Sequence, residues 1–168
     1  MLERLGPAAP IVAGLLALAG AVLLFLALKD NLLKALPASG AVILLPTDLV
    51  VAKEFKPGAA HRTVPAGNIA PDEMALDVGP DSVKAFENRL LTTRTLVWNG
   101  PFGAFETAPF DRGTVTAAQI VAAATRAGSL LSVAGGGDTV AALAHAGVEA
   151  DFTYVSTAGG AFLEWLEG

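Results

Sequence analysis

Short apolar runs alternate with alanine-rich stretches and glycine-rich turns from about Leu32 onward, and this alternation constrains the fold more than any other feature. Each run is apolar at consecutive positions, which is typical of strands that are buried on both faces of a parallel sheet. Strands that alternate with helices form α/β domains, in which helices cover the sheet. The sequence therefore predicts a three-layer α/β sandwich, with helices on both faces of one parallel sheet.

The predicted elements follow from the lengths of these runs and from the glycine and proline residues that end them. Parallel strands are expected at Ala41–Leu45, Thr95–Trp98, Leu130–Ala134 and Phe152–Val155. Two further runs, at Leu49–Glu54 and Arg62–Pro65, indicate a small antiparallel excursion around a Lys-Pro-Gly turn. Helices are expected at Asp30–Leu36, Asp81–Leu90 (starting at Pro80 or Asp81), Thr114–Ala127, Thr139–Ala146 and Ala161–Glu167.

The N-terminal segment has a different composition, so we divide the chain into residues 1–28 and residues 29–168. No charged residue occurs between Pro7 and Leu28, and this stretch is about long enough to cross a bilayer as a helix. We therefore expect one long apolar helix at residues 8–28, which is a candidate membrane anchor. The flanking charges cancel and give no orientation. The alternatives are a buried helix of a soluble protein and sequence that is foreign to the ancestral domain.

The charge and the rare residue types exclude several classes of function. The net charge is -5 and the basic residues are scattered, which argues against a nucleic-acid partner. The chain has no cysteine, so disulfides and thiolate metal sites are excluded. The two histidines, His61 and His145, lie far apart, and no cluster of ligating residues has the spacing of a structural zinc site.

A glycine-rich loop, Gly135-Gly136-Gly137-Asp138-Thr139, runs from an apolar strand into a helix. Successive glycines let backbone N–H groups approach a ligand closely, and a helix N-terminus suits a phosphate. Thr139 can donate its hydroxyl to a phosphate oxygen. A carboxylate beside an anion is most useful when it holds a cation such as Mg²⁺, so Asp138 is a candidate metal ligand. The alternative is that Asp138 caps its helix, and the two roles are compatible.

Two further loops leave strands at the same predicted edge of the sheet. The loop at residues 156–161 contains Gly159 and Gly160 and offers a second anion-binding helix end; the alternative is a tight turn packed against the sheet. The loop at residues 98–106 ends in Glu106, which can accept both hydroxyls of a ribose; the alternative is a solvated surface side chain. Glycine loops in successive strand–helix units favour one phosphate-bearing ligand that spans both.

Five segments occur in the order and at about the spacing found in one enzyme family. They are LPTDLVVAKEF, ALDVGPDS, VWNGPFGAFE, GGGDT and STAGGAFLEWLEG, and the match as a whole covers about residues 30–168. In these segments the chain resembles the C-terminal, nucleotide-binding lobe of phosphoglycerate kinase. The resemblance implies a Rossmann-like fold, a cytoplasmic location, and Mg²⁺ with ATP or ADP as cofactor. It also implies a role in transferring a phosphoryl group between 1,3-bisphosphoglycerate and ADP in glycolysis.

The resemblance also implies roles for single residues. Glu106 is expected to hold the ribose and Asp138 the metal. The residues expected to surround the phosphates of the nucleotide are Asn99, Gly100, Gly135, Gly136, Gly137, Asp138 and Thr139. Gly159 and Gly160 are expected to stabilise the phosphoryl group during transfer, and are therefore the candidate catalytic residues.

The chain also departs from the family pattern. Ala158 stands where the pattern has glycine, a change that leaves Gly159 and Gly160 intact. Nothing resembles the glycerate-binding N-terminal lobe, the lysines that reach the nucleotide phosphates are missing, and residues 1–28 match nothing in the family. We therefore expect nucleotide binding without phosphoryl transfer, and a glycerate substrate only if an N-terminal lobe is supplied. The alternatives are a membrane-anchored nucleotide-binding module and a remnant without ligand affinity.

Overall fold

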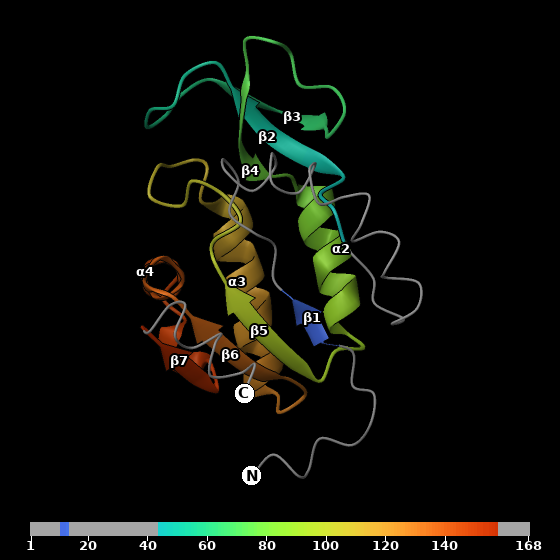
Figure 1. Cartoon of the computed structure of the whole chain (residues 1–168), viewed down its shortest axis with the longest axis vertical. Helices are drawn as coiled ribbons and strands as arrows, with labels where there is room; N and C mark the ends of the chain where they lie inside the picture. The colour runs from blue at the N-terminus through green and yellow to red at the C-terminus, as the bar shows by residue number, and fades with distance from the viewer. Residues whose placement is uncertain (1–10, 14–43, 158–168) are drawn as a thin grey trace, which may run out of the picture.

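The computed structural model describes residues 11–13 and 44–157 of the 168-residue chain (Figure 1). Its elements, in chain order, are β1 (Ile11–Ala13), β2 (Asp48–Ala52), β3 (His61–Pro65), β4 (Met74–Val78), α2 (Pro80–Leu90), β5 (Thr95–Asn99), α3 (Arg112–Arg126), β6 (Leu131–Gly135), α4 (Gly137–His145), the 3-10 helix η2 (Glu149–Asp151) and β7 (Tyr154–Ser156). The α/β class that the alternating runs predict is therefore confirmed.

These strands form two sheets, which lie at opposite ends of the molecule in Figure 1. The larger sheet has the order β1-β5-β6-β7, and all of its neighbouring strands are parallel. The smaller sheet has the order β3-β2-β4 and is antiparallel. The predicted parallel strands that correspond to β5, β6 and β7 are confirmed, and so is the antiparallel pair that corresponds to β2 and β3.

Helices α2, α3 and α4 share one hydrophobic cluster with the parallel sheet. Leu96 and Trp98 are the buried residues of β5, while their neighbours along the strand are half-buried, so these two side chains point toward the helices. Trp98 stacks on Phe102 with ring centroids 5.1 Å apart and meets Phe86 of α2 edge-on at 6.2 Å. The sequence also predicts helices on the other face of this sheet. The helices expected at residues 30–36 and 161–167 lie outside the described residues.

The N-terminal part of the chain differs from the prediction at the residues that the structure describes. Ile11–Ala13 form strand β1, which pairs in parallel with β5 at the edge of the sheet. A continuous helix at residues 8–28 is therefore wrong at these three positions, where a β-branched Ile-Val pair follows Pro10. The rest of that segment lies outside the described residues. None of the helices in the described part of the chain is both long enough and apolar enough to cross a bilayer.

Other predictions fall partly or wholly outside the described residues. The helices expected at residues 30–36 and 161–167 lie outside, as do residues 41–43 of the expected strand at 41–45. Leu44 and Leu45 are described, and they belong to no strand. The strand next to β5 at the edge of the sheet is β1, which the sequence analysis did not predict.

Strand β4 is an element that the sequence analysis did not predict. Its sequence, Met-Ala-Leu-Asp-Val, contains an aspartate, a residue type that is depleted in strands. The strand nevertheless pairs with β2 along its length, with a register shift between Val50 and Val51. Asp77 is completely buried in this strand. A buried carboxylate requires hydrogen-bond donors; for Asp77 these are the N–H of Gly113, at the start of α3, and the N–H of Val78, the next residue of the strand.

Carboxylates from the small sheet cap the N-termini of α2 and α3. Asp48 of β2 accepts hydrogen bonds from the backbone N–H groups of Asp81, at 3.1 Å, and Ser82, at 2.8 Å. Asp77 of β4 accepts one from the N–H of Gly113 at 2.7 Å. The predicted start of α2 at Pro80 is confirmed, but the carboxylate that caps the helix comes from strand β2. These contacts fasten the small sheet to the helical layer.

Candidate functional site

The carboxyl ends of β5, β6 and β7 are level with one another. Asn99 pairs with Gly135, and Gly135 pairs with Ser156, so the last residues of the three strands form one row. In open α/β sheets, ligands bind beyond this edge. The structure therefore brings together the first two predicted loops and the beginning of the third. Gly159 and Gly160 lie outside the described residues.

The loop between β6 and α4 leaves the start of the helix open. Gly136 is the N-cap residue and has a φ of 100°, a conformation that favours glycine. A Cβ on Gly136 would lie 3.1 Å from Oδ1 of Asn99, so the loop also packs closely against the end of β5. Nothing lies within 4 Å of the position where Gly137 would carry a Cβ. The first turn of α4 is thus accessible to a ligand.

Asp138 is exposed and lies in the first turn of α4. The interpretation of Asp138 as the N-cap is wrong, because Gly136 occupies that position and no side chain caps the helix. The reason is that the helix begins at Gly137, two residues before the expected Thr139, so that Asp138 lies inside the first turn. The Asp138 carboxylate is therefore not used for capping, which leaves it accessible to a cation.

Thr139 connects the first two loops. Its side chain is only 1% exposed, and Oγ1 accepts a hydrogen bond from the backbone N–H of Gly100 at 2.7 Å. Gly100 is 39 residues earlier in the chain and has a φ of 90°. The hydroxyl oxygen therefore has a structural partner, and donation of its proton to a phosphate stays a prediction. This bond fixes the loop after β5 to the start of α4.

Glu106 lies in the long loop between β5 and α3 and is exposed. It lines a shallow pocket of about 200 Å³ together with Asp138. The other lining residues are Phe55, Pro101, Gly103, Ala104, Phe105 and Thr107. The structure thus places the predicted ribose-binding and metal-binding carboxylates in one pocket, although they are contributed by different strand–helix units.

Phe55 is a pocket residue that the sequence analysis missed. It follows β2 and its side chain is 58% exposed, which is unusual for a phenylalanine. Its position between Glu54 and Lys56, two charged residues, is the sequence signal that could have identified it. An exposed ring beside a pocket offers a flat apolar surface to a ligand.

The donor set around this pocket fits a magnesium–nucleotide complex better than a bare metal ion. Among the described residues there is no group of three or more His, Cys, Asp or Glu side chains that could hold a metal. Mg²⁺ is commonly bound by one or two carboxylates, with phosphate oxygens and water completing the shell. Asp138 and the open start of α4 could together hold such a complex.

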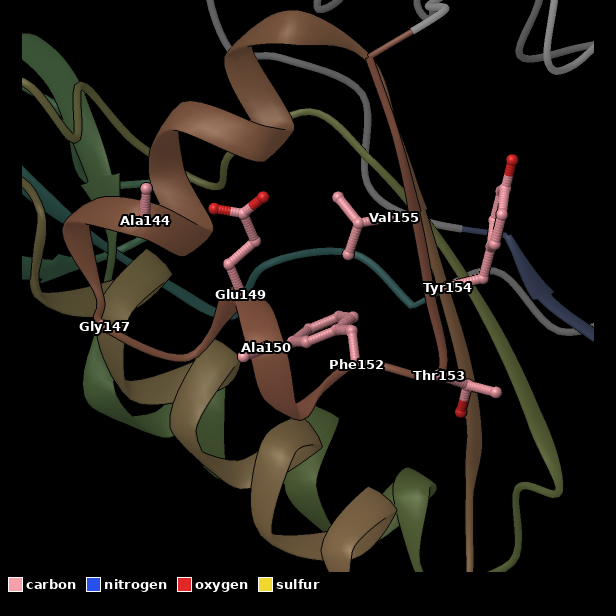
Figure 2. Close-up of a pocket in the computed structure, with 8 residues that line it drawn as sticks. All are labelled: Ala144, Gly147, Glu149, Ala150, Phe152, Thr153, Tyr154 and Val155. Carbon is pink, nitrogen blue, oxygen red and sulfur yellow. The ribbon is translucent and has the colours of Figure 1, made fainter.

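A larger cavity, of about 610 Å³, lies elsewhere, beside the C-terminal end of α4 (Figure 2). Residues of α4, η2 and β7 and of the segments between them line it, among them Ala144, Glu149, Phe152 and Val155. Figure 2 shows Val155 on the α4 side of β7 and Tyr154 on the other side. Among the described residues that line it, Glu149 is the single carboxylate and none is a predicted site residue.

Comparisons with known proteins agree on one family. The family model for phosphoglycerate kinase matches residues 24–168, which includes five residues of the segment to which the sequence analysis assigned no resemblance. A phosphoglycerate kinase from Rhizorhabdus wittichii is 62% identical over 144 residues, which are 84% of this chain and 36% of that protein. One from Sphingopyxis alaskensis is 64% identical over 134 residues, 80% of this chain and 34% of the relative.

Solved structures give the same result. The phosphoglycerate kinase of Coxiella burnetii superimposes with a TM-score of 0.78 and 36% identity, over 86% of this chain and 36% of that structure. The enzyme from Pyrococcus horikoshii gives a TM-score of 0.67 at 25% identity, over 86% of this chain and 34% of the other. The chain spans about a third of the length of the relatives that it matches.

Proposed function

Because this chain belongs to the phosphoglycerate kinase family, we propose that it binds the magnesium complex of an adenine nucleotide at the carboxyl edge of its parallel sheet. The observation that supports this most directly is the pocket shared by Glu106 and Asp138. In the family that the chain resembles, a nucleotide bound in this lobe takes part in phosphoryl transfer between 1,3-bisphosphoglycerate and ADP.

The two carboxylates have different parts in this proposal. Glu106 accepts hydrogen bonds from the hydroxyls of the ribose. Asp138 holds Mg²⁺ directly or through water, and the bound ion neutralises charge on the phosphates. Phe55, at the rim of the same pocket, offers its exposed ring to an apolar part of the nucleotide.

The phosphates are proposed to lie at the start of α4. Free N–H groups of the first helical turn, together with the helix dipole, attract an anion, and Gly136 and Gly137 leave the approach open. Asn99, Gly100 and Gly135 form the floor of this region, because the strand ends that carry them are in register. Gly159 and Gly160 remain the proposed stabilisers of the phosphoryl group during transfer.

Phosphoryl transfer depends mainly on positioning the substrates and stabilising charge. The 168-residue sequence has no segment that resembles the glycerate-binding lobe, and the lysines that reach the phosphates are missing. We therefore propose that this polypeptide binds the nucleotide without turning it over. An assay with MgATP and 3-phosphoglycerate should give no rate above the uncatalysed background, and turnover by the purified chain would overturn this part of the proposal.

Calorimetric titration with MgADP tests the binding site. We expect the dissociation constant to rise about tenfold for Asp138→Ala and for Glu106→Gln, because each removes one charge-assisted contact. Glu149→Gln, in the separate cavity beside α4, is the matched control and should leave affinity unchanged. Equal affinity of the wild type and both pocket variants would place the nucleotide elsewhere.

A further inference from the structure

The loop that presents Glu106 is held by hydrogen bonds to β4 and to the start of α3. The backbone N–H of Ala104 donates to the carbonyl oxygen of Leu76 at 2.8 Å. The N–H groups of Phe102 and Gly103 donate to Oγ1 of Thr114, at 3.0 and 3.3 Å. The beginning of this loop is therefore fixed to a strand of the small sheet and to the first turn of α3.

Asp77 lies where the beginning and the end of this loop meet. One oxygen of its carboxylate, Oδ2, accepts the N–H of Gly113 at 2.7 Å, and Oδ1 accepts the N–H of Val78 at 2.8 Å. A Cβ on Gly103 would lie 2.3 Å from Oδ1, and one on Gly113 would lie 2.5 Å from the same atom. The carboxylate thus fills the space between Gly103, before Glu106 in the chain, and Gly113, after it.

No basic side chain forms an ion pair with Asp77 among the described residues. The side chain is 0% exposed. The pKa of Asp77 is raised to about 7, mainly by burial; the N–H groups of Gly113 and Val78 act to lower it, and the nearby Asp111 carboxylate adds to the rise. Asp111 is itself paired with Nε2 of His145 at 2.9 Å. Burying a carboxylate without a paired cation costs free energy, and the hydrogen bonds and packing of Asp77 offset part of this cost.

Resting on the proposed function, we propose that Asp77 is a positioning residue for the nucleotide pocket: it holds the Gly103 and Gly113 ends of the loop together and so sets where Glu106 stands relative to Asp138. Asp77 does not line that pocket. It acts through the backbone of the loop, and its effect on affinity is therefore transmitted through Glu106.

A double-mutant cycle with the full chain tests this role. MgADP affinity is measured for the wild type, Asp77→Asn, Glu106→Gln and the double variant. We expect Asp77→Asn to raise the dissociation constant about tenfold when Glu106 is present and less than about twofold when it is replaced, because contacting or coupled residues give non-additive effects. A role confined to stability would leave the same factor in both backgrounds.

Asp48→Asn provides the matched control. Asp48 is also a largely buried carboxylate from the small sheet that caps a helix, but it caps α2 and contacts neither Gly103 nor Gly113. We expect Asp48→Asn to lower the melting temperature, as Asp77→Asn does, while it leaves the dissociation constant within about twofold. A comparable loss of affinity in Asp48→Asn would overturn the positioning role.

Gly103→Ala takes the place of Asp77→Asn in the cycle if the latter does not fold. Its added methyl would crowd Oδ1 of Asp77 and the carbonyl oxygen of Phe110, at 2.3 and 2.8 Å, while the cap on Gly113 is retained. In the cycle with Asp77→Asn or in the one with Gly103→Ala, an equal change in the MgADP dissociation constant with and without Glu106 would overturn the inference. Absence of MgADP binding by the wild type overturns the proposed function itself, and the two failures are thereby distinguished.

Discussion

Helices α3 and α4 follow neighbouring strands of the same parallel sheet, yet their N-termini are completed in opposite ways. The start of α3 receives the buried carboxylate of Asp77 from outside the helix. The start of α4 has no side-chain cap, a glycine with open space around it, and the exposed Asp138 in its first turn. One helix end is used for the fold, whereas the other is left available to a ligand.

The comparison shows that the placement of a carboxylate decides what a strand–helix unit can do. A carboxylate buried against helix N–H groups satisfies donors that an anionic ligand would otherwise use. A carboxylate at the surface of the first turn leaves those donors available and can attract a cation to accompany the anion. The same helix geometry therefore supports stability at α3 and the proposed nucleotide site at α4.

The largest effect that we expect is a dependence of stability on pH through Asp77. Its pKa is raised from 3.8 to about 7 in the folded protein, so the folded state binds a proton that the unfolded state loses near pH 4. The free energy of unfolding should therefore fall as the pH rises from about 4 to about 7, by up to about 4 kcal/mol at 1.36 kcal/mol for each unit.

Urea denaturation between pH 5 and 7.5 measures this contribution as the difference between the wild type and Asp77→Asn. The interval avoids the protonation of Glu73, whose pKa is lowered to about 2 by its hydrogen bond with Arg62 and whose effect appears only at lower pH. Parallel curves for the two proteins would show that Asp77 does not titrate there, and the contrast between buried and exposed carboxylates would lose its electrostatic basis.

A matched pair of glycine substitutions should give the next largest difference. In Gly113→Ala, the added Cβ would lie 2.5 Å from Oδ1 of Asp77 and 2.6 Å from Cγ2 of Val78, and we expect a loss of about 3 kcal/mol from overpacking. In Gly137→Ala the added methyl meets open space, so stability should change by less than about 1 kcal/mol. Similar losses in the two variants, measured by denaturation, would contradict the contrast.

Local sequence patterns located α2, α3 and α4 to within about two residues, but they did not identify the side chains that cap α2 and α3. Helix α2 begins at Pro80, one of the two expected starts, whereas α3 and α4 each begin two residues before the expected Thr114 and Thr139. The caps of α2 and α3 come from Asp48 and Asp77, more than 30 positions away from the groups that they bind. Contacts of this kind depend on the tertiary fold and cannot be predicted from neighbouring residues. Conversely, Asp138 stands where a local cap was one of the two interpretations, and it does not cap α4.

The same reasoning explains the pocket. Glu106 and Asp138 were each predicted from the loop that carries them, but their meeting in one pocket depends on the register of β5 with β6. Phe55 was missed because it reaches that pocket from the small sheet, and strand β4 was missed because its aspartate looked unfavourable for a strand. The candidate residues and their common edge of the sheet could thus be predicted from sequence, whereas the shared pocket and the contribution of Phe55 could not.

A substitution at the open helix end should separate binding from stability. We expect Asp138→Asn to change the free energy of unfolding by less than about 0.5 kcal/mol, because the side chain is exposed and caps nothing. Its affinity for MgADP should nevertheless fall about tenfold, or about 1.4 kcal/mol. Denaturation and calorimetry on the same preparation test both, and a large loss of stability would reveal a structural role at α4 like that at α3.

The smallest effect on stability is expected for the contact between the end of α4 and the start of α3. His145, at the end of α4, pairs with Asp111, the N-cap residue of α3, through side chains that are 44% and 21% exposed. We expect His145→Gln to cost less than about 0.5 kcal/mol, because partly exposed pairs contribute little. A loss of several times that value in denaturation would mean that the two helix ends are energetically coupled rather than independent.

The cap on α2 has a consequence for how this protein can change over generations. A Cβ on Gly79 would lie 2.1 Å from Oδ2 of Asp48, so the two positions, 31 apart, constrain each other. Any larger residue at 79 is accessible only after the aspartate has been replaced, and that first step already exposes the variant to the cost of an uncapped helix. Each replacement alone is expected to lower stability, so the two positions are expected to change in a coupled way.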